Sequence, residues 1–275
     1  MNSLAKRIFD KLATPASGTA ASPYEYLLAL PRYTEVTVDL LGRDFRVADP
    51  ASFYWNYREI FVQELYKFHC SKPAPLIIDC GANYGTSILY FNKMFPSARI
   101  IGVEADPNIF EILQSNIIMR GLTHIKLLNR AVSVEANPVK FYSEGADAGR
   151  LHYLETAQGA FEVEPIKLDD LIDDEVDFLK VDIEGAETQA ICSCEKLDRV
   201  SQLFIEYHSF KDSKQTLADL LSKLSRHNFR YYIHTEFCSP RPLIQEKLQL
   251  GMDLQLNIFA KRNICQNTAP HADAV

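Results

Sequence analysis

The sequence lacks an excess of basic residues. Twenty-nine lysines and arginines stand against 36 aspartates and glutamates, so the net charge is −7. Proteins that bind duplex nucleic acids usually carry a basic excess or a basic stripe, and neither is present. Long apolar runs are lacking too, since none approaches the roughly 18 residues that a membrane-spanning helix needs. We therefore expect no nucleic-acid partner and no transmembrane segment.

Paired cysteine motifs are also lacking. The six cysteines form no CxxC pair, and the closest two, Cys192 and Cys194, have no histidine cluster beside them to complete a zinc site. Free thiols in a reducing compartment are the simplest interpretation. Residues 1–14 contain no uninterrupted apolar stretch, so no signal peptide is expected. Together these features predict a cytoplasmic protein.

The chain has 275 residues, of which 47% are hydrophobic and 24% are charged, as is ordinary for globular proteins. Before residue 76 the sequence predicts a hairpin around Gly42 and an aromatic-rich helix over residues 51–68. We expect residues 1–75 to form a helical and hairpin extension or cap. A single domain is expected over residues 76–262, followed by a flexible tail over residues 263–275.

From residue 76 onward, short apolar runs alternate with helical segments. The apolar runs predict core strands at residues 76–80, 99–104, 125–129, 176–182 and 202–207, with closing strands at 230–236 and 254–260. This alternation predicts an α/β fold with a doubly wound, mainly parallel sheet and an antiparallel edge strand. A hairpin is expected between residues 139 and 166, and its polar loop, residues 145–150, is a candidate lid.

Ligands on such a sheet bind beyond the carboxyl ends of the strands, so the residues after each strand are the informative ones. The first core strand ends in Ile-Asp-Cys-Gly-Ala-Asn-Tyr-Gly, residues 78–85. Glycines in this turn let a ligand approach the backbone, and the N–H groups of the following helix suit an anion. The dinucleotide-binding fingerprint requires glycines where Asn83 and Thr86 stand, which disfavours a nicotinamide oxidoreductase.

Two acidic residues sharpen this interpretation. Asp79, just before the turn, would repel a pyrophosphate but would tolerate a ligand with a cationic centre, such as S-adenosyl-L-methionine. Glu104 ends the second strand about twenty residues after the turn, where a carboxylate can accept hydrogen bonds from both ribose hydroxyls. The alternative is that Glu104 only favours the start of the next helix. Its position at the end of the strand favours the ribose role.

The fourth strand contains charged residues that alternate along the chain. Lys180, Asp182 and Glu184 share one face, and charges are unexpected in a central parallel strand. A buried network between the lysine and the carboxylates is therefore predicted. The alternative is an edge strand with a solvated face.

The fifth strand ends with Glu206 and His208 on one face. The unperturbed pKa of a histidine, about 6.5, suits a general base. An alternative is that Asp182, Glu206 and His208 hold a divalent metal such as Mg²⁺. A third interpretation is a structural imidazole that is only hydrogen-bonded.

Taken together, the motifs resemble the FkbM family of methyltransferases. The segments that carry the resemblance are Ile-Asp-Cys-Gly-Ala-Asn-Tyr-Gly (78–85), Val-Glu-Ala-Asp-Pro (103–107), Arg-Ala-Val-Ser (130–133), Leu-Asp-Asp-Leu (168–171), Phe-Leu-Lys-Val-Asp-Ile-Glu-Gly-Ala-Glu (178–187) and Ile-Glu-Tyr-His-Ser (205–209). The resemblance implies a Rossmann-like class I fold that uses S-adenosylmethionine. It also implies O-methylation of a hydroxyl on a sugar, a glycan or a natural product.

The resemblance also implies roles for individual residues. The cofactor loop is matched by Asp79, Gly81, Asn83 and Gly85. Glu104 matches the ribose acid, and Asp182 and Glu184 match the acidic motif after the fourth strand. We expect Asp182 or His208 to take the proton of the acceptor hydroxyl.

The expected partner is a small-molecule or glycan acceptor, and the sequence indicates no oligomeric state. The alternative function is a non-catalytic module that binds S-adenosylmethionine and acts as a scaffold in a glycan or secondary-metabolite pathway. Such a module would keep Glu104 and the glycine turn but would not need His208.

Overall fold

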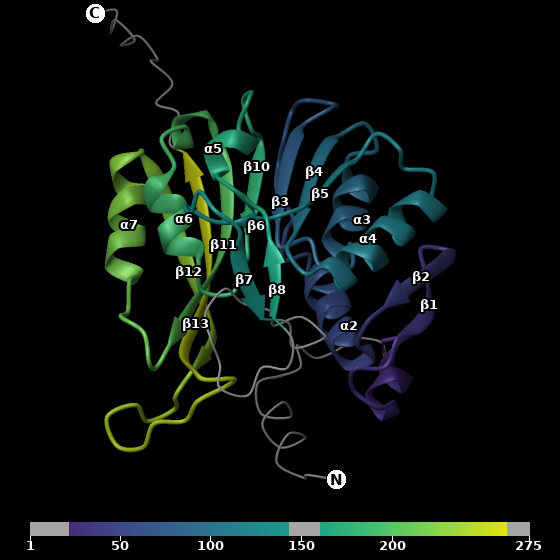
Figure 1. Ribbon diagram of the computed structural model, residues 1–275, viewed down its shortest axis with the longest axis horizontal. Coiled ribbons are helices and arrows are strands. Elements are labelled where there is room, and N and C mark those ends of the chain that lie inside the picture. The colour runs from purple at the N-terminus through teal and green to yellow at the C-terminus, as the bar shows by residue number, and fades with distance from the viewer. Residues whose placement is uncertain (1–21, 143–159, 263–275) are drawn as a thin grey trace, which may run out of the picture.

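The computed structural model describes residues 22–142 and 160–262 (Figure 1). The candidate lid over residues 145–150 and the predicted tail over residues 263–275 lie outside the described residues. Within them, one seven-stranded sheet forms the centre of the fold, in the order β12-β13-β11-β10-β3-β4-β5. The strands are β3 (Leu76–Cys80), β4 (Arg99–Glu104), β5 (Lys126–Asn129), β10 (Phe178–Val181), β11 (Gln202–Phe210), β12 (Phe229–Cys238) and β13 (Met252–Arg262).

The direction of the strands confirms the predicted doubly wound, mainly parallel sheet. β3, β4, β5, β10 and β11 pair in parallel, whereas β13 pairs antiparallel with both β11 and β12. The antiparallel strand β13 is therefore second from one end of the sheet, between β11 and the outermost strand β12. The strand order reverses between β3 and β10, because β3 continues to β4 on one side while β10 lies on the other. In a doubly wound sheet, this switch point is where a ligand binds.

Helices cover both faces of the sheet (Figure 1). The helices are α3 (Thr86–Met94) and α4 (Pro107–Met119) on one face, and α5 (Leu168–Leu171), α6 (Glu187–Ser193) and α7 (Leu217–Arg226) on the other. Each face buries its own cluster of apolar side chains. α4 begins as expected, because the side chain of Asp106 accepts hydrogen bonds from two backbone N–H groups and Pro107 occupies the first turn.

The segment before the sheet packs on the same face as α3 and α4. It contains η1 (Glu25–Ala29), β1 (Val36–Leu40), β2 (Arg43–Val47), α2 (Pro50–Tyr57) and the π-helix η2 (Arg58–Val62). The predicted hairpin is present, with Gly42 at φ +76° in its turn. The predicted helix over residues 51–68 is wrong at its C-terminal end. It ends at Val62, and Glu64 takes a left-handed φ of 55° that an α-helix does not allow.

Smaller elements complete the fold. β7 (Val139–Tyr142) and β8 (Ala160–Val163) form the predicted inserted hairpin, β6 (Ala131–Val132) pairs in parallel with β9 (Pro165–Ile166), and η3 (Leu197–Arg199) precedes β11. Among the described residues, no helix combines the length and apolar character needed to cross a bilayer. The five cysteines in the described part of the chain are all free thiols, as expected.

Candidate active site

The turn after β3 brings the predicted cofactor-loop residues to the carboxyl end of the sheet. Gly81, Asn83 and Gly85 have φ angles of 85°, 48° and 98°, all in the left-handed region. A Cβ at position 81 would overlap the backbone carbonyl oxygen of Asp182, which follows β10. Glycine is therefore required at position 81 for β3 and β10 to approach each other, whatever ligand lies above the turn.

Glu104, at the end of β4, connects to that turn. Its Oε2 accepts a hydrogen bond of 2.8 Å from the backbone N–H of Asn83, and its Oε1 accepts one of 2.8 Å from the N–H of Asp106. Burial raises the pKa of Glu104 to about 7, although these two backbone donors lower it. Each carboxylate oxygen can accept a further hydrogen bond. The group therefore fits a ligand that offers two hydroxyl donors, as a ribose does.

The predicted charge network lies between β3 and β10. Lys180 is buried, and its Nζ donates to the carbonyl oxygen of Gly81 at 2.9 Å and lies 3.3 Å from Asp79 and 3.2 Å from Asp182. Asp79 is fully buried and also accepts from the hydroxyl of Ser87. Burial lowers the pKa of Lys180, but the carboxylates of Asp182 and Asp79 outweigh burial and raise it well above the ordinary value. The predicted buried network between the lysine and carboxylates is therefore confirmed, and β10 is a central strand. The prediction that Glu184 shares a strand face with Lys180 is wrong, because β10 ends at Val181 and Glu184, at a left-handed φ of 54°, lies beside His208 instead.

His208, on β11, is held from one side by an acid that the sequence analysis did not single out. Its Nδ1 lies 2.9 Å from Oε1 of Glu187, the first residue of α6, and both side chains are almost fully buried. The same oxygen accepts hydrogen bonds from the backbone N–H groups of Ile183 and Gly185, which identifies it as an acceptor. His208 therefore donates its Nδ1–H to Glu187 and directs Nε2 away from it. The sequence indicated Glu187 as a site residue only through its place as the last acid of the 178–187 segment.

Carboxylates also surround Nε2 of His208. Glu184 lies at 3.7 Å and Glu206 at 3.8 Å. Burial lowers the pKa of His208, but Glu184, Glu187 and Glu206 outweigh burial and raise it well above the ordinary value. Burial raises the pKa of Glu206 to about 8 and that of Glu184 well above its usual range. The cluster therefore holds protons at neutral pH.

Three of these side chains lie close enough together to hold a metal ion. Asp182, Glu184 and His208 each offer one ligand atom, and these atoms lie within 4.8 Å of one another. The predicted ligand Glu206 is not in this group, and its Oε1 instead accepts a hydrogen bond from Gln255. Oxygen and imidazole ligands suit a divalent cation, and a carboxylate on the other ring nitrogen is usual for a metal-bound histidine.

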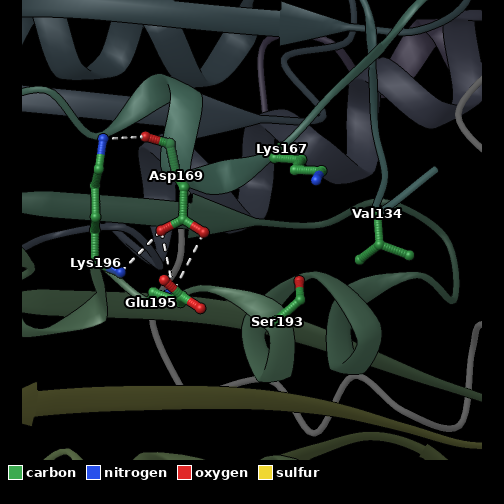
Figure 2. A pocket seen from close by; sticks show the side chains of 6 residues that line it. All are labelled: Val134, Lys167, Asp169, Ser193, Glu195 and Lys196. Atoms are coloured by element: carbon green, nitrogen blue, oxygen red, sulfur yellow. Dashed lines mark hydrogen bonds between the residues drawn. The ribbon is translucent and has the colours of Figure 1, made fainter. Parts of the chain in front are cut away.

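A separate pocket of about 380 Å³ lies between the start of α5 and the end of α6 (Figure 2). It is lined by Val134, Lys167, Asp169, Ser193, Glu195 and Lys196, none of which was predicted as a site residue. The carboxylate of Asp169 accepts from the backbone N–H groups of Glu195 and Lys196, and Lys196 Nζ donates to the backbone carbonyl of Asp169. These contacts join two segments of the fold, so we assign this region a structural role.

Residues 79–231, more than half of the chain, match the family model of the methyltransferase FkbM domain. The chain belongs to the FkbM methyltransferase family. It is therefore a methyltransferase, as the sequence motifs predict. The span that matches the FkbM model contains the glycine turn, Glu104, the 178–187 segment and His208. β13 and the segment before β3 lie outside it.

A curated relative supports this assignment. The methyltransferase sdnD of Sordaria araneosa is 28% identical over 191 residues, which cover 52% of this chain and 73% of the relative. Two solved structures are also similar. The methyltransferase FkbM from Methylobacillus flagellatus KT is 20% identical, with 74% of this chain and 47% of that chain covered and a TM-score of 0.44. The precorrin-6y C5,15-methyltransferase from Geobacter metallireducens GS-15 is 14% identical, with 74% and 89% covered and a TM-score of 0.44.

Proposed function

We propose that this FkbM-family enzyme O-methylates a hydroxyl of a small molecule or glycan, such as a sugar or a natural product. The observation that carries the proposal is the Glu187–His208 pair, in which the acid fixes the orientation of the imidazole. This imidazole lies at the carboxyl end of the sheet, where the glycine turn and Glu104 also lie. An alcohol must lose its proton when it is methylated, whereas a neutral amine can attack through its lone pair. A histidine positioned by a buried acid therefore favours an oxygen acceptor.

The cofactor is proposed to lie across the carboxyl ends of β3 and β4. Glu104 would accept hydrogen bonds from its ribose hydroxyls, and the turn that contains Gly81, Asn83 and Gly85 would hold its amino-acid end. When bound, S-adenosylmethionine supplies a methyl group on a sulfonium centre, which is a good leaving group. Asp79 contributes indirectly, because its carboxylate faces Lys180 and the ammonium of Lys180 holds the carbonyl of Gly81.

In its neutral form, His208 is proposed to take the proton of the acceptor hydroxyl at Nε2, while Glu187 keeps the proton on Nδ1 and fixes the ring. Because the neighbouring carboxylates raise the pKa of His208, this neutral form becomes more populated as the pH rises. Asp182 is the other predicted proton acceptor, but its carboxylate is already engaged by the ammonium of Lys180 at 3.2 Å. The acceptor oxygen must be held about 3 Å from the methyl group for direct displacement, so positioning supplies much of the catalysis.

A metal-assisted version of the same reaction uses Asp182, Glu184 and His208 as ligands. The observation that favours it is that their ligand atoms lie within 4.8 Å of one another in an otherwise acid-rich cluster. A divalent cation there would acidify a bound hydroxyl. Chelation with EDTA separates the two versions. Turnover that is lost and then restored by Mg²⁺ supports the metal, whereas unchanged turnover supports His208 acting without it.

Two measurements in sequence test the proposed function. Isothermal titration calorimetry with S-adenosylmethionine tests cofactor binding, and mass spectrometry of hydroxylated glycan, lipid and natural-product acceptors then tests for the gain of one methyl group. Binding followed by methylation of a hydroxyl supports the proposal. Binding with no methylation of any acceptor supports the scaffold function, and methylation confined to amines would overturn the choice of oxygen.

A further inference from the structure

Two side-chain amides on β13 lie beside His208 and Glu206. Gln255 is the register partner of His208, and Asn257 is the register partner of Glu206, so these four side chains share one face of the sheet. Gln255 is 9% exposed and Asn257 is 5% exposed. Amides so deeply buried normally have all their polar atoms hydrogen-bonded.

The nitrogen atoms of both amides are bonded, but their oxygen atoms are not. Nε2 of Gln255 donates to Glu206 and lies 3.4 Å from Nε2 of His208, and Nδ2 of Asn257 donates to Glu236 on β12 at 3.1 Å. Among residues 22–142 and 160–262, no group forms a hydrogen bond with the buried Oε1 of Gln255 or Oδ1 of Asn257. Two adjacent buried acceptors are therefore left without a donor from the described part of the chain.

The charged groups on this face disfavour an anionic ligand. Among the described residues, no lysine or arginine forms an ion pair with Glu206 or Glu236. The ammonium of Lys180 donates to the carbonyl oxygen of Gly81 and forms ion pairs with Asp79 and Asp182. His208 on this face already lies beside the carboxylates of Glu184, Glu187 and Glu206. A phosphate or carboxylate bound here would therefore meet an acid-rich surface whose nearby cations already face carboxylates. A neutral hydroxyl can donate to the amide oxygens without that penalty.

The spacing of the amides indicates more than one hydroxyl. Alternate residues of a strand are about 7 Å apart, so Gln255 and Asn257 would form hydrogen bonds with different groups of one ligand. Resting on the proposed function, we propose that Gln255 and Asn257 are specificity-determining residues that bind hydroxyl groups of a neutral polyhydroxylated acceptor next to the hydroxyl that is methylated. Both lie outside residues 79–231, the segment that matches the family model.

The test uses neutral methyl glycosides as probes, with glucuronic acid as the anionic counterpart. Binding is measured by saturation-transfer NMR on the full chain in the presence of saturating S-adenosylhomocysteine. We expect the wild type to bind at least one neutral glycoside and to bind glucuronic acid more weakly. Gln255→Met and Asn257→Leu should each weaken glycoside binding by about tenfold or more, the effect of losing one hydrogen bond in a buried site.

The matched control is Gln202→Met. Gln202 lies on the same face of β11 at its opposite end and donates to the backbone carbonyl of His69. This variant should bind glycosides as the wild type does. The affinity for S-adenosylhomocysteine confirms in each variant that the fold is intact. If Gln255→Met or Asn257→Leu does not fold, Gln255→Ala and Asn257→Ala replace them, and we expect the same loss of glycoside affinity.

The outcomes separate this inference from the proposed function. A wild type that does not bind S-adenosylhomocysteine contradicts the proposed function. A wild type that binds it but binds no neutral glycoside, or binds glucuronic acid equally well, overturns the inference alone. Unchanged glycoside affinity in both amide variants also overturns it.

Discussion

Oε2 of Glu104 lies 2.8 Å from the backbone nitrogen of Asn83, so the acid at the end of β4 is tied directly to the turn that follows β3. This contact brings together two features that lie 21 residues apart in the sequence. It fixes the carboxylate beside the backbone on which we place the amino-acid end of the cofactor. A ligand that bridges the two strand ends therefore meets one preformed surface.

Removing the Glu104 carboxylate should weaken cofactor binding. Glu104→Ala deletes the acceptor for two ribose hydroxyls, and we expect the affinity for S-adenosylhomocysteine to fall by about 1–3 kcal/mol. Isothermal titration calorimetry measures this directly. Glu111→Ala, on α4, is the control and should leave the affinity unchanged. Equal affinities in Glu104→Ala and the wild type would remove the ribose role.

Cofactor binding should also depend on pH. Burial raises the pKa of Glu104 from its ordinary 4.5 to about 7, so the free protein holds a proton there below neutral pH. The ionised carboxylate is the better acceptor for hydroxyls, so binding favours its deprotonation. The affinity for S-adenosylhomocysteine should therefore rise as the pH rises through about 7 and level off above it. In Glu104→Gln, which does not titrate, calorimetry should show a flatter profile, and an equally steep one would contradict this assignment.

Gly81 should be far less tolerant of substitution than a glycine with similar backbone angles. Gly81 and Gly121 have φ angles of 85° and 69°, but only at Gly81 would a Cβ strike a backbone atom. Gly121→Ala should cost about 1–2 kcal/mol of unfolding free energy, the strain of a left-handed alanine. Gly81→Ala should cost at least a further 1–3 kcal/mol, because Asp182 must move. Urea denaturation compares them, and equal costs would contradict the close packing of β3 and β10.

Turnover should depend on the Glu187–His208 pair, while cofactor affinity should not. His208→Ala should lower turnover by about 10²-fold or more because the proton acceptor is lost. Glu187→Gln should also lower turnover, because an amide can present a donor to Nδ1 and disturb the ring. His227→Ala, which removes one of the partners of Asp198 near the protein surface, is the matched control. Wild-type turnover in His208→Ala would assign the imidazole a structural role only.

The ion pairs of two lysines should differ greatly in their contribution to stability. Lys180→Met leaves the buried Asp79 and the neighbouring Asp182 without their cation, and we expect a loss of about 3–5 kcal/mol in unfolding free energy. Lys67→Met removes an exposed pair with Glu64 and should cost less than about 1 kcal/mol. Similar losses in the two variants, measured by denaturant titration, would contradict the buried network.

The sheet was largely predictable because its strands carry a strong local signal. β3 and β4 begin and end at the predicted residues, since each is an apolar run bounded by proline, glycine or a charged residue. The position of β13 between β11 and β12 was not predictable in the same way. Sequence order places β13 after β12, and only packing decides which neighbour the last strand joins.

The sequence predicted most of the residues of the candidate site, but it did not predict which of them contact one another. The charges of Lys180 and Asp182 stand out in an apolar strand, so a network was expected before its geometry was known. Glu187 was not recognised as the partner of His208, because the two residues lie on different elements and are 21 positions apart. Gln255 and Asn257 were missed because amides on an alternating strand give no signal by type alone.

The most direct test of the central claim is a crystal structure of the chain with S-adenosylhomocysteine. We predict that the nucleoside lies across the ends of β3 and β4, with both ribose hydroxyls within hydrogen-bond distance of Glu104 and the amino-acid end at the turn of residues 81–85. A nucleoside bound elsewhere, or a ribose that makes no contact with Glu104, would contradict the account.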